Sequence, residues 1–128
     1  MGTVAVESQR VANQVVESSV VEQQAAAEQK MNALWTEHRP LLLQRVDMLE
    51  REFWNWIRSP DEKATAVIAR DLAHKMAGVL GTFGMKRGSM IASSLEKIAG
   101  MPKHGQRAGA STVYALLSEL RSVIQARR

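Results

Sequence analysis

The side chain best placed to do chemistry in this chain is His74. Between residues 68 and 83, large apolar residues recur at intervals of three and four, which is typical of one face of an α-helix. The predicted core-facing stripe consists of Ile68, Leu72, Met76, Val79 and Phe83. His74 lies about 200° around such a helix from Leu72, on the face that should meet solvent. A neutral imidazole nitrogen exposed there is a nucleophile that a second molecule can reach.

Small residues surround His74 on the predicted outer face. Gly78 follows it by about one turn and Gly81 by about two, and Arg70 precedes it by one turn. Each glycine inside a helix costs about 1 kcal/mol relative to alanine, so helix stability does not explain the pair. A helix surface without bulky side chains would let another macromolecule approach the imidazole. The predicted docking surface consists of Val67, Ala77, Gly78, Gly81 and Met90, with Ser94 as a further candidate.

The stretch around His74 also resembles a known family. The run Ala73-His74-Lys75-Met76-Ala77-Gly78, followed by Gly81 and Gly84, is similar to the signature of histidine-containing phosphotransfer (HPt) domains. Leu95-Glu96 falls where that family often has a Leu-Glu pair. The resemblance covers residues 32–127 and is sharpest over 70–96. It departs from the family at Ala77, where many members have lysine. Arg70 is the predicted substitute for that lysine as the contact to the phosphoryl group.

The resemblance implies a phosphorelay intermediate of two-component signalling. In such a role His74 would accept a phosphoryl group on Nε2 from the aspartyl phosphate of a receiver domain and pass it to another receiver. The implied partners are response-regulator receiver domains and a hybrid sensor kinase. Because Ala77 replaces the usual lysine, the alternative is a non-catalytic helical module that only docks on a receiver. A basic helical domain that binds nucleic acid is a third, weaker interpretation.

Nothing in the sequence resembles a nucleotide pocket, so no kinase activity of its own is expected. The spacing of Gly78, Gly81 and Gly84 matches neither G-x-G-x-x-G nor the P-loop. The absence of cysteine excludes disulfides, thiol catalysis and cysteine-bound zinc. His38, His74 and His104 are too dispersed for a metal motif, so no metal or cofactor is predicted. Whether the chain counts as an enzyme is left open.

Composition and charge favour one small globular domain. The chain has 128 residues, of which 45% are hydrophobic. Its net charge of +4 combines −2 in residues 1–30 with +6 in the rest. The basic residues are dispersed, which favours a solvated surface or an acidic protein partner over nucleic acid. No apolar run reaches the length of a membrane span and no secretory signal is evident. We therefore expect a cytoplasmic monomer without a membrane partner.

The positions of apolar residues predict an all-α fold. No segment alternates with period two, so no strand is expected. The predicted helices span residues 31–58, 60–82, 85–99 and 108–126, joined by short connections that include a loop over 100–105. Pro40 should kink the first helix or make it restart. Ser59 and Pro60 should cap the second helix and Gly84 should follow its end. The expected fold of residues 31–128 is an antiparallel up-down four-helix bundle.

Residues 1–30 are predicted to form an extension outside that bundle. They contain valine, alanine, glutamate and glutamine but no leucine, isoleucine or aromatic residue. Such a stretch could bury little surface alone, which favours a frayed helix or a disordered lead. The alternative is a helix that pairs with a copy of itself. In the first predicted bundle helix, His38 falls on the inner stripe and is expected in the core or at its boundary.

Overall fold

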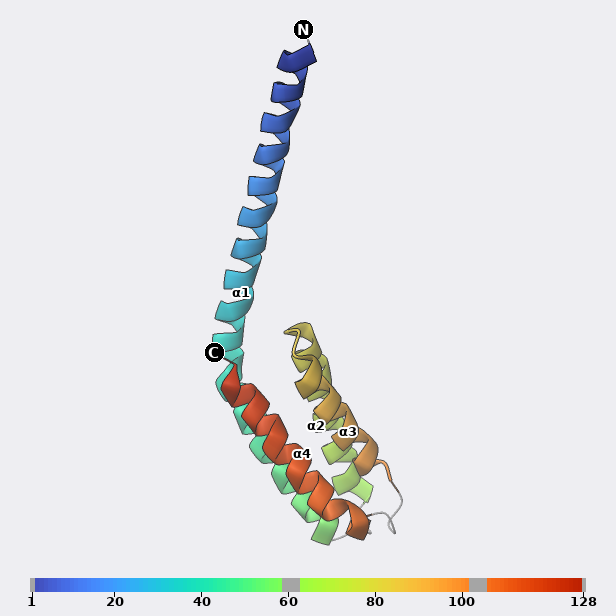
Figure 1. The fold of residues 1–128 in the computed structure, drawn as a ribbon. Helices are drawn as coiled ribbons and strands as arrows, with labels where there is room; N and C mark the ends of the chain where they lie inside the picture. Colours follow the sequence, from blue (N-terminus) through green and yellow to red (C-terminus); the bar gives the residue numbers. More distant parts are fainter. Residues whose placement is uncertain (1, 59–62, 102–105, 128) are drawn as a thin grey trace. The chain divides into compact units, whose positions relative to one another are not determined.

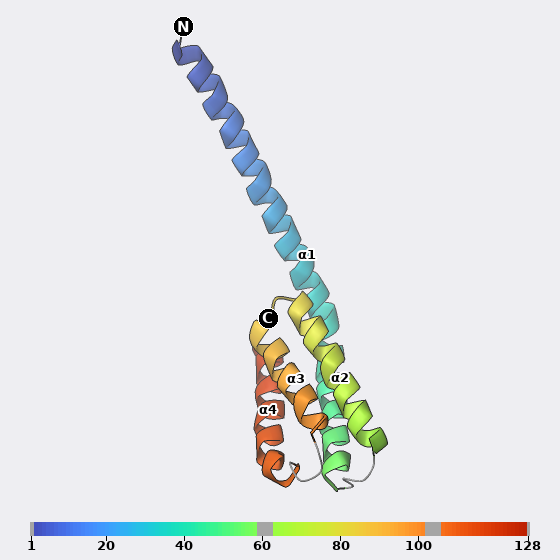
Figure 2. The same cartoon turned by 90° about the vertical axis from the view of Figure 1, so that its right-hand side faces the viewer.

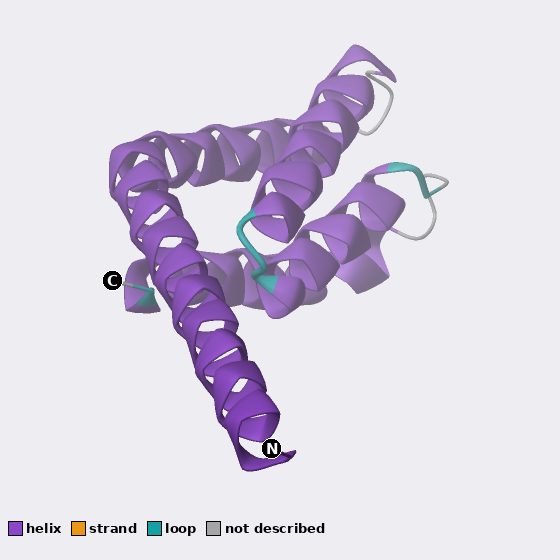
Figure 3. Cartoon of the chain, turned by 90° about the horizontal axis from the view of Figure 1, so that it is seen from above, coloured by secondary structure: helices purple, strands orange, loops and turns teal. Residues whose placement is uncertain are grey.

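In the computed structural model, the described residues 2–58, 63–101 and 106–127 form four helices and no strand. The helices are α1 (Gly2–Arg58), α2 (Lys63–Thr82), α3 (Lys86–Ala99) and α4 (Gln106–Ala126) (Figure 1). Figure 3 shows the described turn between α2 and α3 in teal. The predicted all-α class is confirmed. Ser59, Pro60 and the loop positions 102–105 lie outside the described residues.

The chain divides into two compact units, Met1–Leu34 and Trp35–Arg128. In the first unit, α1 is helical from Gly2 onward, and the side chains of residues 16–30 are exposed. Helix α1 contains Pro40 without interruption, so the restart considered there does not occur. Trp35 and Leu42 are both buried in the core of the second unit and hold the helix on either side of the proline.

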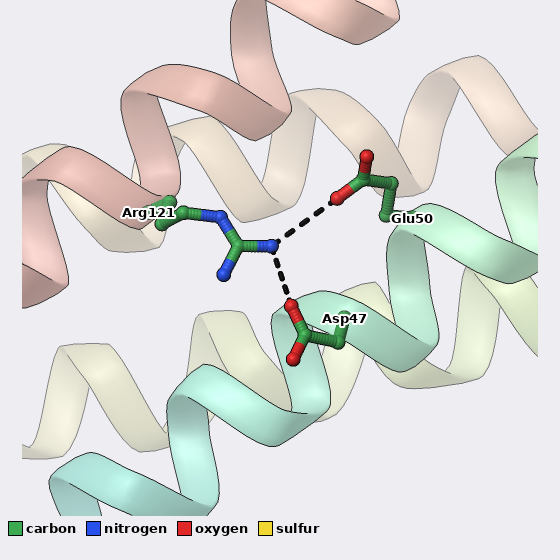
Figure 4. Close-up of polar contacts among 3 residues, drawn as sticks. All are labelled: Asp47, Glu50 and Arg121. Carbon is green, nitrogen blue, oxygen red and sulfur yellow. Dashed lines mark hydrogen bonds and ion pairs between the residues drawn. The ribbon is translucent and has the colours of Figure 1, made fainter.

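In the second unit, α1 and α4 run antiparallel, because their contacts pair in reverse order along the chain. The indole Nε1–H of Trp35 donates to the carbonyl oxygen of Arg127 at 3.1 Å. The guanidinium of Arg121 on α4 lies 2.6 Å from Oδ1 of Asp47 and 3.2 Å from Oε2 of Glu50, both further along α1 (Figure 4). The hydrogen bond to Asp47 raises the pKa of Arg121 above its ordinary value, and partial burial opposes that shift.

Helices α2 and α3 also pack antiparallel. The Ser89 hydroxyl of α3 donates to the carbonyl oxygen of Ala77 at 2.8 Å. A Cβ on the buried Gly88 would lie 3.2 Å from Leu80 Cδ1, so the absence of a side chain at Gly88 lets the two helices approach closely. With α3 and α4 joined through Arg87 and Glu119, the four segments form an up-down bundle (Figure 2).

The bundle core contains large apolar residues from α1 and smaller ones from α2. The buried hydrophobic residues are Trp35, Leu42, Val46, Leu49, Phe53, Trp56, Ala69, Ala73, Met76, Leu80, Ile91, Ala92, Leu95, Ala99, Val113, Leu117, Leu120 and Ile124. The α3 and α4 stripes largely agree with the apolar spacing of the sequence. Ile98 is only half-buried, and Ala99 takes the buried position beside it.

The predicted core stripe of α2 is wrong in its orientation. Helix α2 buries Thr65, Ala69, Ala73, Met76 and Leu80. Ile68 is exposed, whereas Leu72, Val79 and Phe83 are half-buried. The buried line is rotated by about 60° from the expected one, with Met76 common to both. The reason is steric, since the alanines on this line allow α2 to approach its neighbours closely.

One end of the bundle is closed around Phe83 and Arg127. The Arg127 guanidinium donates to the carbonyl oxygen of Phe83 at 2.6 Å and lies 4.9 Å from the centre of the Trp35 ring. Gly84 follows Phe83 with a φ of 73°, a left-handed conformation that favours glycine and ends the helix as predicted. His38 is exposed but its ring contacts that of Phe83, so it lies at the boundary of the core and not inside it.

Candidate functional site

His74 projects from the exposed side of α2. Its side chain is 73% exposed, while Ala73, its neighbour in the sequence, is fully buried. The side chain lies about 140° around the helix from the centre of the buried line. The rotation of the core stripe therefore does not bring His74 into the core, and the predicted exposure of the imidazole is confirmed.

A carboxylate on the neighbouring helix holds the imidazole in one orientation. His74 Nδ1 lies 3.0 Å from Oε1 of Glu96 on α3. An ionised carboxylate can only accept a hydrogen bond, so this contact assigns the ring hydrogen to Nδ1. When the ring is neutral, the lone pair is on Nε2, the nitrogen farther from the backbone. The contact thus defines the tautomer of the neutral imidazole and leaves Nε2 available as its nucleophilic nitrogen.

The sequence did not assign Glu96 this positioning role. Its carboxylate reaches His74 only because α2 and α3 pack antiparallel in the register set by Ser89 and Ala77. The two residues are 22 positions apart, so no helical periodicity links them. Sequence reasoning could have found the pair only by aligning the two helices across the turn at Gly84.

The two glycines beside His74 are exposed and are not required by packing. A Cβ built on Gly78 would meet nothing within 4 Å. A Cβ on Gly81 would lie 3.6 Å from Ser89 Oγ, which is an ordinary contact. Ala77, by contrast, is half-buried and packs against the core. The uncovered helix surface near the imidazole is therefore formed by Gly78 and Gly81 more than by Ala77.

The other predicted site residues lie on the exposed surfaces of α2 and α3. Val67 is exposed on α2, and Arg70 is exposed one turn before His74. Met90 on α3 is 67% exposed. Ser94 is exposed on the same helix and its hydroxyl donates to the Met90 carbonyl oxygen at 3.0 Å. These residues place apolar, small and cationic groups on the two helices that carry His74 and Glu96.

Within the described ranges, no group of three histidine, cysteine, aspartate or glutamate residues is arranged to hold a metal ion. No helix in the described part of the chain has the length and apolar character of a membrane span. No protein-family model, no curated protein and no solved structure matches the chain. The chemistry of the site therefore has to be argued from its own residues.

Proposed function

We propose that this chain is a phosphorelay intermediate of the histidine-containing phosphotransfer type. His74 reversibly accepts a phosphoryl group from the aspartyl phosphate of a receiver domain and passes it to a second receiver. The observation that carries the proposal is the 3.0 Å contact between Nδ1 of the exposed His74 ring and Glu96. In the neutral ring, that contact leaves the lone pair on Nε2, the nitrogen farther from the backbone, as nucleophilic attack on phosphorus requires.

The transfer step follows from this tautomer. The Nε2 lone pair attacks the phosphorus and forms an N–P bond while the P–O bond to the aspartate breaks. The bonding electrons leave with the aspartate carboxylate. No proton has to leave the ring, because Nδ1 keeps its hydrogen and the positive charge that develops is balanced by Glu96 and the phosphoryl oxygens. Transfer to the second receiver is the same step in reverse.

The surroundings of His74 support a macromolecular phosphodonor. The exposed glycines leave room beside the imidazole, and Val67 and Met90 supply apolar surface suited to a transient protein contact. Arg70 is a suitable partner for phosphoryl oxygens because its guanidinium offers several N–H donors. In this proposal the receiver supplies Mg²⁺ and most of the charge neutralisation. The chain supplies one nitrogen held on a rigid helix.

A second function is favoured by one specific observation. Ala77 occupies the position where many HPt domains carry lysine, and here its methyl group packs against the core. A chain without that cation could dock on a receiver and occupy its surface without accepting the phosphoryl group. The two functions share a docking surface and differ only in whether His74 reacts.

The deciding experiment follows a labelled phosphoryl group. The full chain is incubated with each phosphorylated receiver of the source organism, and acid-labile label on the chain is measured. His74→Gln should abolish labelling, whereas His38→Gln, which removes another exposed histidine, should leave it unchanged. Equal labelling of His74→Gln and the parent would refute the proposal. Receiver binding without any acid-labile product would identify the docking module instead.

A further inference from the structure

The part of α1 in the first unit has an apolar stripe, which Gln23 and Lys30 interrupt. Its described members are Val16, Val20, Ala27, Met31 and Leu34. On a helix these five residues fall within about 40° of one line. Val16 and Val20 are 62% and 45% exposed, and Leu34 is 37% exposed. A helix with one uncovered apolar stripe is typical of a segment that packs against another helix.

The spacing of this face identifies the kind of helix that fits it. Val20, Ala27 and Leu34 recur every seven residues. A seven-residue period is maintained along two helices only when they wind around each other with a left-handed twist. A partner helix must therefore have the same period, and a second copy of α1 satisfies that condition by identity.

We propose that residues 16–34 form a parallel, in-register coiled coil with the same segment of a second copy of this chain. In that alignment Gln23 meets Gln23, so this polar residue of the interface pairs with its own copy. An antiparallel alignment of the same face would place Gln23 against Ala27 and Lys30 against Val20. That arrangement would bury polar groups against apolar ones without compensation.

The composition of the seam indicates a reversible dimer. Val20, Ala27 and Leu34 occupy one of the two core positions of the heptad. A valine there favours two-stranded assemblies, whereas an alanine buries little surface. Lys30 lies three residues after Ala27, at the other core position of the heptad, where it meets Lys30 of the second copy. These like charges repel, although the long side chain lets each ammonium group reach solvent. This inference replaces the expectation of a monomer. It does not depend on phosphotransfer at His74, which lies in the second unit.

Sedimentation equilibrium of the full chain over a range of concentrations tests the dimer. The average mass should rise from 14.2 kDa toward twice that value as concentration increases. Val20→Glu should keep the mass at that of one chain. Val21→Glu is the matched control, because Val21 is also an exposed valine but lies about 100° around the helix. Glutamate is a better helix former than valine, so circular dichroism should show helix retained in both variants.

The outcomes of this measurement separate the alternatives. A parent chain that stays at 14.2 kDa up to its solubility limit would overturn the proposal. Equal weakening by Val20→Glu and Val21→Glu would overturn it as well, because association would then use another surface. Lys30→Leu should tighten the dimer by about tenfold, since it replaces a repulsive pair by an apolar one.

Cross-linking tests the parallel alignment. The chain contains no cysteine, so each introduced thiol is unique in its copy. Oxidation of Ala27→Cys should give a disulfide-linked dimer, because a parallel seam brings residue 27 of each copy together. Ser18→Cys, on the opposite side of α1, should not cross-link at the same concentration. A dimeric Ala27→Cys variant that fails to cross-link would overturn the alignment.

Discussion

Replacing Gly78 by alanine should stabilise the bundle, although the residue lies beside the proposed reactive group. Gly78 lies inside α2, where glycine is less favourable than alanine by about 1 kcal/mol. A Cβ at this position meets nothing within 4 Å, so no steric cost offsets the gain. The free energy of unfolding should therefore rise by about 1 kcal/mol, which raises the melting temperature by about 4 °C or more in a domain of this size.

Gly84→Ala is the matched control for this reasoning. A Cβ on Gly84 also meets nothing within 4 Å, but the backbone there has a φ of 73°. An alanine in that conformation should cost about 1 kcal/mol, so the sign of the effect reverses. Urea unfolding followed by circular dichroism measures both variants. If the two substitutions changed stability in the same direction, the account of both glycines would be refuted.

Gly78→Leu then separates clearance from chemistry. Leucine is a good helix former, so the fold should survive, but its side chain would stand one turn from His74. Phosphoryl transfer from a receiver should slow by about tenfold or more, a loss of about 1.4 kcal/mol in transition-state binding. Labelling by phosphoramidate, a small donor, should change little. If the receiver phosphorylated Gly78→Leu at the parent rate, the proposed need for a helix surface without side chains beside His74 would be refuted.

Three further substitutions test the contacts around the site and the bundle. Glu96→Ala should slow labelling of His74 by about tenfold because the ring loses its partner, and Glu96→Gln should restore part of the rate. Single-turnover assays measure these rates. Equal rates in the parent and both variants would contradict the positioning role. Arg127→Ala should lower the free energy of unfolding by about 2 kcal/mol, since it removes the guanidinium contacts to the Phe83 carbonyl and to an aromatic ring, and urea unfolding measures the loss. Arg121→Ala should cost less than about 1 kcal/mol, with the difference shrinking in high salt, because its ion pairs are solvent-exposed.

The helices were predictable because their signals are local. The apolar stripe of α4 and the stop at Gly84 depend on residues within a few turns of each other. The orientation of α2 was not predictable in the same way. Ile68 and Leu72 are larger and more hydrophobic than Ala69 and Ala73, yet the alanines are buried. Which face is buried depends on how closely the neighbouring helices approach, and a single helix does not encode that distance.

The candidate site also combines features that one helix determines with a contact that needs two helices. The exposure of His74 and the presence of glycines beside it follow from the sequence of one helix. The Glu96 contact requires two helices in a fixed register, and sequence reasoning did not assign it a role. Arg70 was selected for its charge and its spacing from His74, and it lies on the exposed side of α2 as that spacing requires. Its contact with a phosphoryl group stays a prediction.

The short turn at Gly84 has a consequence for how the site assembles. It joins α2 and α3 into a hairpin, and His74 and Glu96 are separated by only 22 positions within it. The Trp35 and Arg127 contact, by contrast, joins residues 92 positions apart. Closing the shorter loop costs less chain entropy. The imidazole should therefore acquire its partner at an early stage of folding, before the ends of the bundle meet.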